Sequence, residues 1–192
     1  MSLIHTITST DTTILCTTRC GHSSMKHYFG IDSHNGGKGY LGRDFLFEDI
    51  RLINTEQVIL CIRNPYDRLL SAVHNTNWLN KHGADMYTFN MHGRGWTESH
   101  SIPYLQYLVP NRNCITHLLQ FDTLKHYIPI SSDTVVSSVI GGVTEYEDWM
   151  GQYWTKSQME SEYSAYSELI HSLPQITVED WHLFTDKYVH DY

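Results

Sequence analysis

Short runs of apolar and β-branched residues alternate along this chain with polar loops and helix-compatible segments. One such run covers Thr12–Thr18, and a second, Val58–Arg63 (VILCIR), ends at Asn64 and Pro65. Runs of this length predict strands buried on both faces of a parallel sheet. A helical pattern follows each run: about His22–Phe29 after the first, and a segment starting at Pro65, where proline suits a first helical turn, after the second.

The same alternation continues to the end of the chain. Residues 114–121 (CITHLLQF) predict a third strand between two short helices, SIPYLQYLV before it and DTLKHYI after it, the latter with Asp122 as its N-cap. The glycine-containing segments 31–57 and 80–99 predict loops, with a short strand or helix near Phe45–Ile53. Aromatic spacing predicts packed helices in the C-terminal part, and no repeat or linker interrupts the pattern. We therefore expect an α/β fold in a single domain, 1–192, with a P-loop-type parallel sheet flanked by helices.

The loops that follow the first two strands carry similar polar residues. TTRCGHSS contains Arg19, Ser23 and Ser24, while RNPYDRLLS contains Arg63 and Ser71. Loops after parallel strands open on one edge of the sheet, where ligands of such folds bind. A guanidinium next to hydroxyls and the backbone N–H groups of a following helix suits an anion. Two such loops predict a ligand that is phosphorylated at two separated positions.

Composition narrows the function classes. The chain has 192 residues, 41% of them hydrophobic, and a formal charge of -8, which disfavours broad binding of nucleic acid. The four cysteines and thirteen histidines show no spacing typical of a zinc site, so no metal is expected. The N-terminal stretch MSLIHTITSTDTTILC predicts neither a signal peptide nor a membrane anchor. We expect a cytoplasmic protein without a membrane partner.

The first loop departs from the ATP-binding pattern G-x-x-x-x-G-K-[ST]. Aligned to that pattern, Cys16 takes the place of the first glycine and Gly21 that of the second. His22 stands where the lysine belongs, and Ser23 supplies the hydroxyl. The missing lysine disfavours a P-loop nucleotide or small-molecule kinase, although such a kinase would share the architecture.

The two loops resemble those of sulfotransferases that use 3'-phosphoadenosine-5'-phosphosulfate (PAPS), particularly the carbohydrate branch. TRCGHSSM is similar to the family's 5'-phosphosulfate loop, and IRNPYDRLLSAVH is similar at nearly every position to its 3'-phosphate motif, R-[DN]-P-x-x-R-L-x-S-A. Weaker likenesses occur in HSIPYLQYL, HLLQFDTLKHY and WHLFTDKYVHDY. The resemblance implies binding of PAPS without a metal. The residues that it implies for this are Arg19, Cys20, Gly21, His22, Ser23, Ser24, Arg63 and Ser71.

Sulfuryl transfer to a hydroxyl also requires a group that accepts the proton of the acceptor and one that stabilises the leaving 5'-phosphate. Arg19 is expected to serve the phosphate. The resemblance places a histidine, His100, as general base, with His34, Asp44 and Glu48 as reserve candidates. The expected function is sulfuryl transfer from PAPS to a hydroxyl acceptor, most simply a carbohydrate. The alternatives are the P-loop kinase and a catalytically silent nucleotide-binding module.

Overall fold

A five-stranded mixed sheet forms the centre of the computed structural model of this chain, which describes residues 4–8, 11–17, 19–30, 44–45, 47–69, 71, 103–129 and 155–190. The strand order is β3-β1-β2-β4-β5. The bounds are Ile4–Thr8 for β1, Thr12–Thr17 for β2, Asp44–Phe45 for β3, Gln57–Ile62 for β4 and His117–Gln120 for β5.

The parallel part of the sheet agrees with the sequence prediction. β2 pairs in parallel with β4, with Leu15 opposite Leu60, and β4 pairs in parallel with β5, with Leu60 opposite Leu118. All six residues of β2 and five of the six residues of β4 are buried, which explains their continuous apolar runs. The N-terminal part differs from the prediction, because β1 and β3 form an antiparallel extension beside β2.

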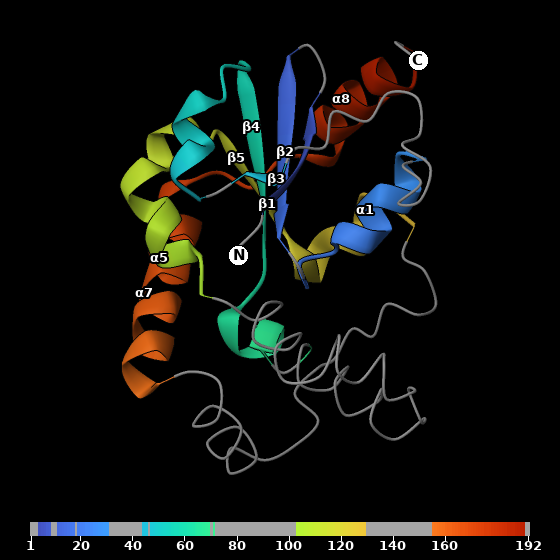
Figure 1. The fold of residues 1–192 in the computed structure, drawn as a ribbon. Coiled ribbons are helices and arrows are strands. Elements are labelled where there is room, and N and C mark those ends of the chain that lie inside the picture. Colours follow the sequence, from blue (N-terminus) through green and yellow to red (C-terminus); the bar gives the residue numbers. More distant parts are fainter. Residues whose placement is uncertain are drawn as a thin grey trace, which may run out of the picture.

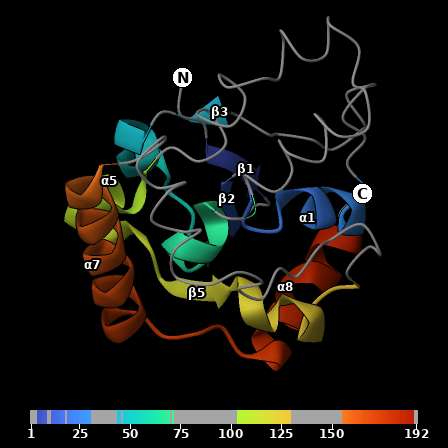
Figure 2. The same cartoon turned by 90° about the horizontal axis from the view of Figure 1, so that it is seen from below.

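Helices cover both faces of the sheet, so the fold is of the α/β type (Figures 1 and 2). α5 and α7 lie on one face, whereas α1 and α8 lie on the other, as both views show. A short helix over 65–69 follows β4 and lies below the sheet in the view of Figure 1. The α-helices are α1 His22–Tyr28, α5 Leu105–Leu108, α7 Lys156–Ser172 and α8 Val178–His190; the 3₁₀ helices are Phe47–Leu52, Val109–Cys114 and Phe121–His126.

The caps of these helices differ from the predictions. Asp122 does not cap the helix after β5; Gln120 takes that place, and Asp122 lies in the first turn of a 3₁₀ helix. The N-cap of α1 is Gly21, and no side chain caps this helix. α7 begins with a capping box in which Thr155 and Gln158 bond reciprocally, so its start is well defined.

The core fills the space between the sheet and both helical layers. Trp181 of α8 is fully buried and packs edge-on against Phe29 and Tyr127, which joins α8 to the face that α1 covers.

Cys16, Cys20 and Cys61 are buried free thiols, consistent with a structural role. A hydrogen bond to Cys61 and burial raise the pKa of the Cys16 thiol, which keeps it protonated at neutral pH. Among the described helices, none is long and apolar enough to cross a membrane.

Candidate anion-binding site

The loops after β2 and β4 touch each other at the carboxyl edge of the sheet. Nη1 of Arg63 donates a hydrogen bond of 3.0 Å to the backbone carbonyl of Arg19. The loop around Arg19 turns sharply, because Arg19 and Gly21 both have positive φ angles, 66° and 87°. The sequence prediction that the two loops share one edge therefore agrees with the structure. Arg63 holds the backbone of the first loop, a role that the motif did not reveal.

Gly21 is required by close packing as well as by its backbone conformation. A Cβ atom at this position would lie 2.5 Å from Cδ2 of Leu124, which follows β5. The turn therefore packs against the 3₁₀ helix Phe121–His126, which follows β5. A residue without a side chain allows this approach and the left-handed conformation together.

Arg63 is held by an aromatic ring as well as by its hydrogen bond. Its side chain is 4% exposed, and its guanidinium carbon lies 4.1 Å from the centroid of the Phe121 ring. Stacking on a ring face favours the cation and fixes the plane of the guanidinium. Arg63 is thus oriented before any ligand arrives.

A third arginine, Arg68, joins this group from the helix that follows β4. It is 3% exposed, and its guanidinium carbon lies 4.6 Å from the centroid of the Tyr104 ring. Burial raises the pKa of Glu162, a carboxyl on α7, and the positive charge of Arg68 opposes part of that rise. The nearby carboxylate is the kind of partner that an arginine with a structural role has. The charge of Arg68 also contributes to the lowered pKa of Arg19.

The charges of Arg63 and Arg68 both repel that of Arg19. The pKa of Arg19 is lowered to about 10, first by burial and then by the positive charges of Arg63 and Arg68. With a pKa of about 10, Arg19 stays charged at neutral pH. A site with this much confined positive charge favours an anion that carries more than one negative charge.

The remaining residues expected at the first loop have different positions. Ser24 is buried in α1, and His22 is half-buried. The Cys20 thiol is buried, accepts a hydrogen bond of 3.1 Å from the hydroxyl of Thr17, and lies 3.4 Å from the hydroxyl of Tyr104. Cys20 therefore contributes its backbone to the turn, while its side chain is a core contact. The side chain of Ser23 lies outside the described part of the structure.

The expected residues outside this loop are described less completely. Ser71 is half-buried just beyond the helix over 65–69. Asp44 and Glu48 belong to β3 and the first 3₁₀ helix, where the description is limited to the backbone. His34 and His100 lie outside the described residues. The assignment of the general base therefore stays a prediction.

Sequence reasoning missed the residues that support the arginines. Tyr104 and Phe121 lie in segments with only a weak family likeness, which gave them no role, and Glu162 carried no motif signal; all three are far from the loops in sequence. Arg68 did carry one, since it is the second arginine of RNPYDR. Over the ranges that the structure describes, no group of three or more His, Cys, Asp or Glu side chains is arranged to hold a metal ion.

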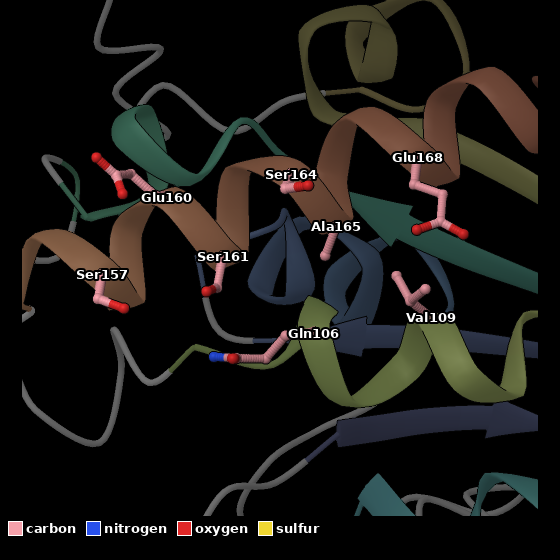
Figure 3. A pocket seen from close by; sticks show the side chains of 8 residues that line it. All are labelled: Gln106, Val109, Ser157, Glu160, Ser161, Ser164, Ala165 and Glu168. Atoms are coloured by element: carbon pink, nitrogen blue, oxygen red, sulfur yellow. The ribbon is translucent and has the colours of Figure 1, made fainter.

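A shallow polar groove runs between α5 and α7, separate from the arginines (Figure 3). Its volume is about 430 Å³. Arg112 and Glu168 form an exposed ion pair of 3.0 Å at this face. The groove is lined by Gln106, Val109, Ser157, Glu160, Ser161, Ser164, Ala165 and Glu168.

Comparison with protein-family models, with curated proteins and with solved structures finds no match to this chain. The contacts of the three arginines are thus the main structural basis for a functional proposal.

Proposed function

We propose that this chain is a PAPS-dependent sulfotransferase, a single P-loop-type domain over residues 1–192, that transfers the sulfuryl group to a hydroxyl of a carbohydrate acceptor. The observation that carries the proposal is the hydrogen bond from Arg63 to the Arg19 carbonyl, which joins the two motif loops. It supports a single polyanion site built from both loops. The RNPYDRLLS motif and the position of His22 in place of the P-loop lysine favour PAPS over ATP.

The arginines suit the two phosphate positions of such a nucleotide. Arg19 lies on the sharp turn after β2, where the resemblance expects the 5'-phosphosulfate. Arg63 starts the motif to which the resemblance assigns the 3'-phosphate, and Ser71 ends it. The donor set is therefore guanidinium groups and hydroxyls, which bind phosphate oxygens through charge-assisted hydrogen bonds.

The proposed chemistry uses few protein groups. PAPS, when bound, supplies an activated sulfuryl group on its 5'-phosphate. The acceptor oxygen attacks sulfur, its proton passes to the general base predicted at His100, and the bond between sulfur and the phosphate oxygen breaks. Arg19 stabilises the negative charge that collects on that phosphate.

Nucleotide binding provides the first test. Calorimetry with 3',5'-bisphosphoadenosine, 5'-AMP and ATP, each with Mg²⁺ and with a chelator, should show tightest binding of the bisphosphate, unaffected by chelation. Ser71→Ala should weaken the bisphosphate by about tenfold or more, the effect of one charge-assisted hydrogen bond, and leave 5'-AMP unchanged. Arg112→Ala, at the exposed ion pair with Glu168, is the matched control. Preference for Mg-ATP would instead favour the kinase.

Turnover provides the second test. Transfer of labelled sulfate from PAPS should be measured with a panel of mono- and oligosaccharide acceptors and with phenolic and steroid alcohols. Transfer to a sugar hydroxyl supports the full proposal. Tight bisphosphate binding without transfer to any acceptor would identify a silent nucleotide-binding module.

A further inference from the structure

We propose that Glu162 and Tyr104 are positioning residues for the anion site, and that Glu162 acts through Arg68 from the opposite end of the chain. This inference rests on the proposed function only in requiring that the arginines bind a phosphorylated anion. It does not depend on which group is transferred.

Glu162 fixes the start of α5. The carboxyl is 1% exposed; one oxygen accepts hydrogen bonds of 2.8 Å from the backbone N–H groups of Tyr104 and Leu105, and the other accepts one of 3.3 Å from Gln106. These are the N-cap and first residues of α5, which has no side-chain cap of its own. A carboxylate from α7 thus satisfies donors that a helix start leaves unpaired within the helix.

Tyr104 connects this capped helix to the first loop. Its backbone N–H bonds Glu162, its ring faces the Arg68 guanidinium at 4.6 Å, and its hydroxyl lies 3.4 Å from the Cys20 thiol. Tyr104 is 1% exposed, so these contacts are enclosed by protein. Tyr104 therefore contacts both Cys20 of the first loop and Arg68.

Arg68 depends on the Tyr104 ring and on Glu162 to keep its position beside Arg19. Its guanidinium is buried and its charge repels that of Arg19, an arrangement that costs free energy. The aromatic face and the negative charge of Glu162 offset that cost. Without the ring and the carboxylate, repulsion from Arg19 favours conformations in which the Arg68 side chain points away from it.

Removal of the Glu162 charge distinguishes two roles of this residue: holding Arg68 in place, or only reducing the positive potential of the anion site. In Glu162→Gln, the amide oxygen can still accept the hydrogen bonds from Tyr104 and Leu105, but the negative charge and the acceptor for the Gln106 N–H are gone. If Glu162 only reduced the positive potential of the site, this change would tighten anion binding. If Glu162 holds Arg68 in place, the change should weaken binding.

The experiment measures the dissociation constant of 3',5'-bisphosphoadenosine by calorimetry. Glu162→Gln should weaken binding by about tenfold, which corresponds to about 1.4 kcal/mol. In an Arg68→Met background, the same substitution should change binding by less than about twofold, because the arginine that it positions is absent. Glu160→Gln is the matched control, since this exposed residue of the same helix pairs with Lys156 at the groove in Figure 3.

A second pair of variants decides the question if Glu162→Gln does not fold. Tyr104→Phe keeps the ring beneath Arg68 and loses the hydroxyl, whereas Tyr104→Leu loses the ring and keeps the backbone bonds to Glu162. Tyr104→Leu should weaken bisphosphate binding more than Tyr104→Phe does. Circular dichroism confirms that each variant is folded.

The outcomes separate this inference from the proposed function. Unchanged or tighter binding by folded Glu162→Gln, or equal effects of the two Tyr104 variants, overturns the positioning role while the anion site stands. Equal effects of Glu162→Gln with and without Arg68 would also overturn it. Failure of the unmodified protein to bind the bisphosphate overturns the proposed function and this inference together.

Discussion

Arg19→Met should make the unliganded protein more stable while abolishing tight anion binding. The pKa of Arg19 is lowered to about 10, by burial first and then by Arg63 and Arg68. This value lies well below the ordinary pKa of arginine, and one pKa unit corresponds to about 1.36 kcal/mol, so the charged form costs up to about 3 kcal/mol in the folded state. Partial access of the side chain to water recovers part of this cost, and we expect a gain of about 1 to 2 kcal/mol.

The sign of this effect follows from proton linkage. A cation whose pKa is lower in the folded than in the unfolded state destabilises the fold wherever it is protonated in both states. For Arg19 the penalty is fully present below about pH 10 and declines as the pH rises through that value. At pH 7 the whole penalty applies, and Met removes it while retaining an unbranched stem of similar length.

Urea unfolding at pH 7, in a buffer free of phosphate, sulfate and nucleotide, measures the gain. A stabilisation of 1 to 2 kcal/mol corresponds to a rise of about 2 to 8 °C in the melting temperature of a chain of this size. Addition of 3',5'-bisphosphoadenosine should then stabilise the unmodified protein and have little effect on Arg19→Met. Arg51→Met, at an exposed position in the 3₁₀ helix Phe47–Leu52, controls for the removal of one positive charge.

A loss of stability in Arg19→Met by more than about 1 kcal/mol without ligand would refute this reasoning, because it would show that Arg19 makes net stabilising contacts. Equal gains in Arg19→Met and Arg51→Met would also refute it, since a general effect of net charge would then explain both.

Four further outcomes are expected. Gly21→Ala should lower the free energy of unfolding by about 1 kcal/mol or more and weaken nucleotide binding, because its Cβ would lie 2.5 Å from Leu124 and its φ is 87°; urea unfolding and calorimetry measure both. Arg63→Ala should weaken 5'-AMP as well as the bisphosphate, since it also releases the first loop's carbonyl, and a loss confined to the bisphosphate would argue against this role. His100→Ala should keep the PAPS dissociation constant and lower kcat by roughly 10² to 10⁴; full turnover at saturating acceptor would exclude it as the base. Burial raises the pKa of Glu162, so this carboxyl stabilises the fold when it is protonated and loses that contribution as the pH rises through its folded pKa. In urea unfolding, the unmodified protein should therefore gain stability relative to Glu162→Gln as the pH falls from 7 toward the ordinary pKa of glutamate.

The sequence by itself determined the local parts of this protein. The apolar runs Thr12–Thr18 and Val58–Arg63 predict buried parallel strands, which the structure has at Thr12–Thr17 and Gln57–Ile62. The strand-to-helix order places Arg19 and Arg63 at one edge of the sheet. Such features depend on side-chain periodicity and on residues adjacent in the chain, so a linear pattern contains them. The linear sequence is therefore sufficient to locate the two motif loops.

The tertiary structure alone decided how the arginines are held. The antiparallel extension by β1 and β3 depends on which distant strand each segment pairs with, and no short pattern specifies that choice. The supports of the site have the same origin: Phe121 stacks on Arg63, and Glu162 reaches the start of α5 because α7 packs against it. Burial, mutual repulsion and long-range hydrogen bonds arise only when these segments meet, which is why sequence reasoning located the arginines but not the contacts that orient them.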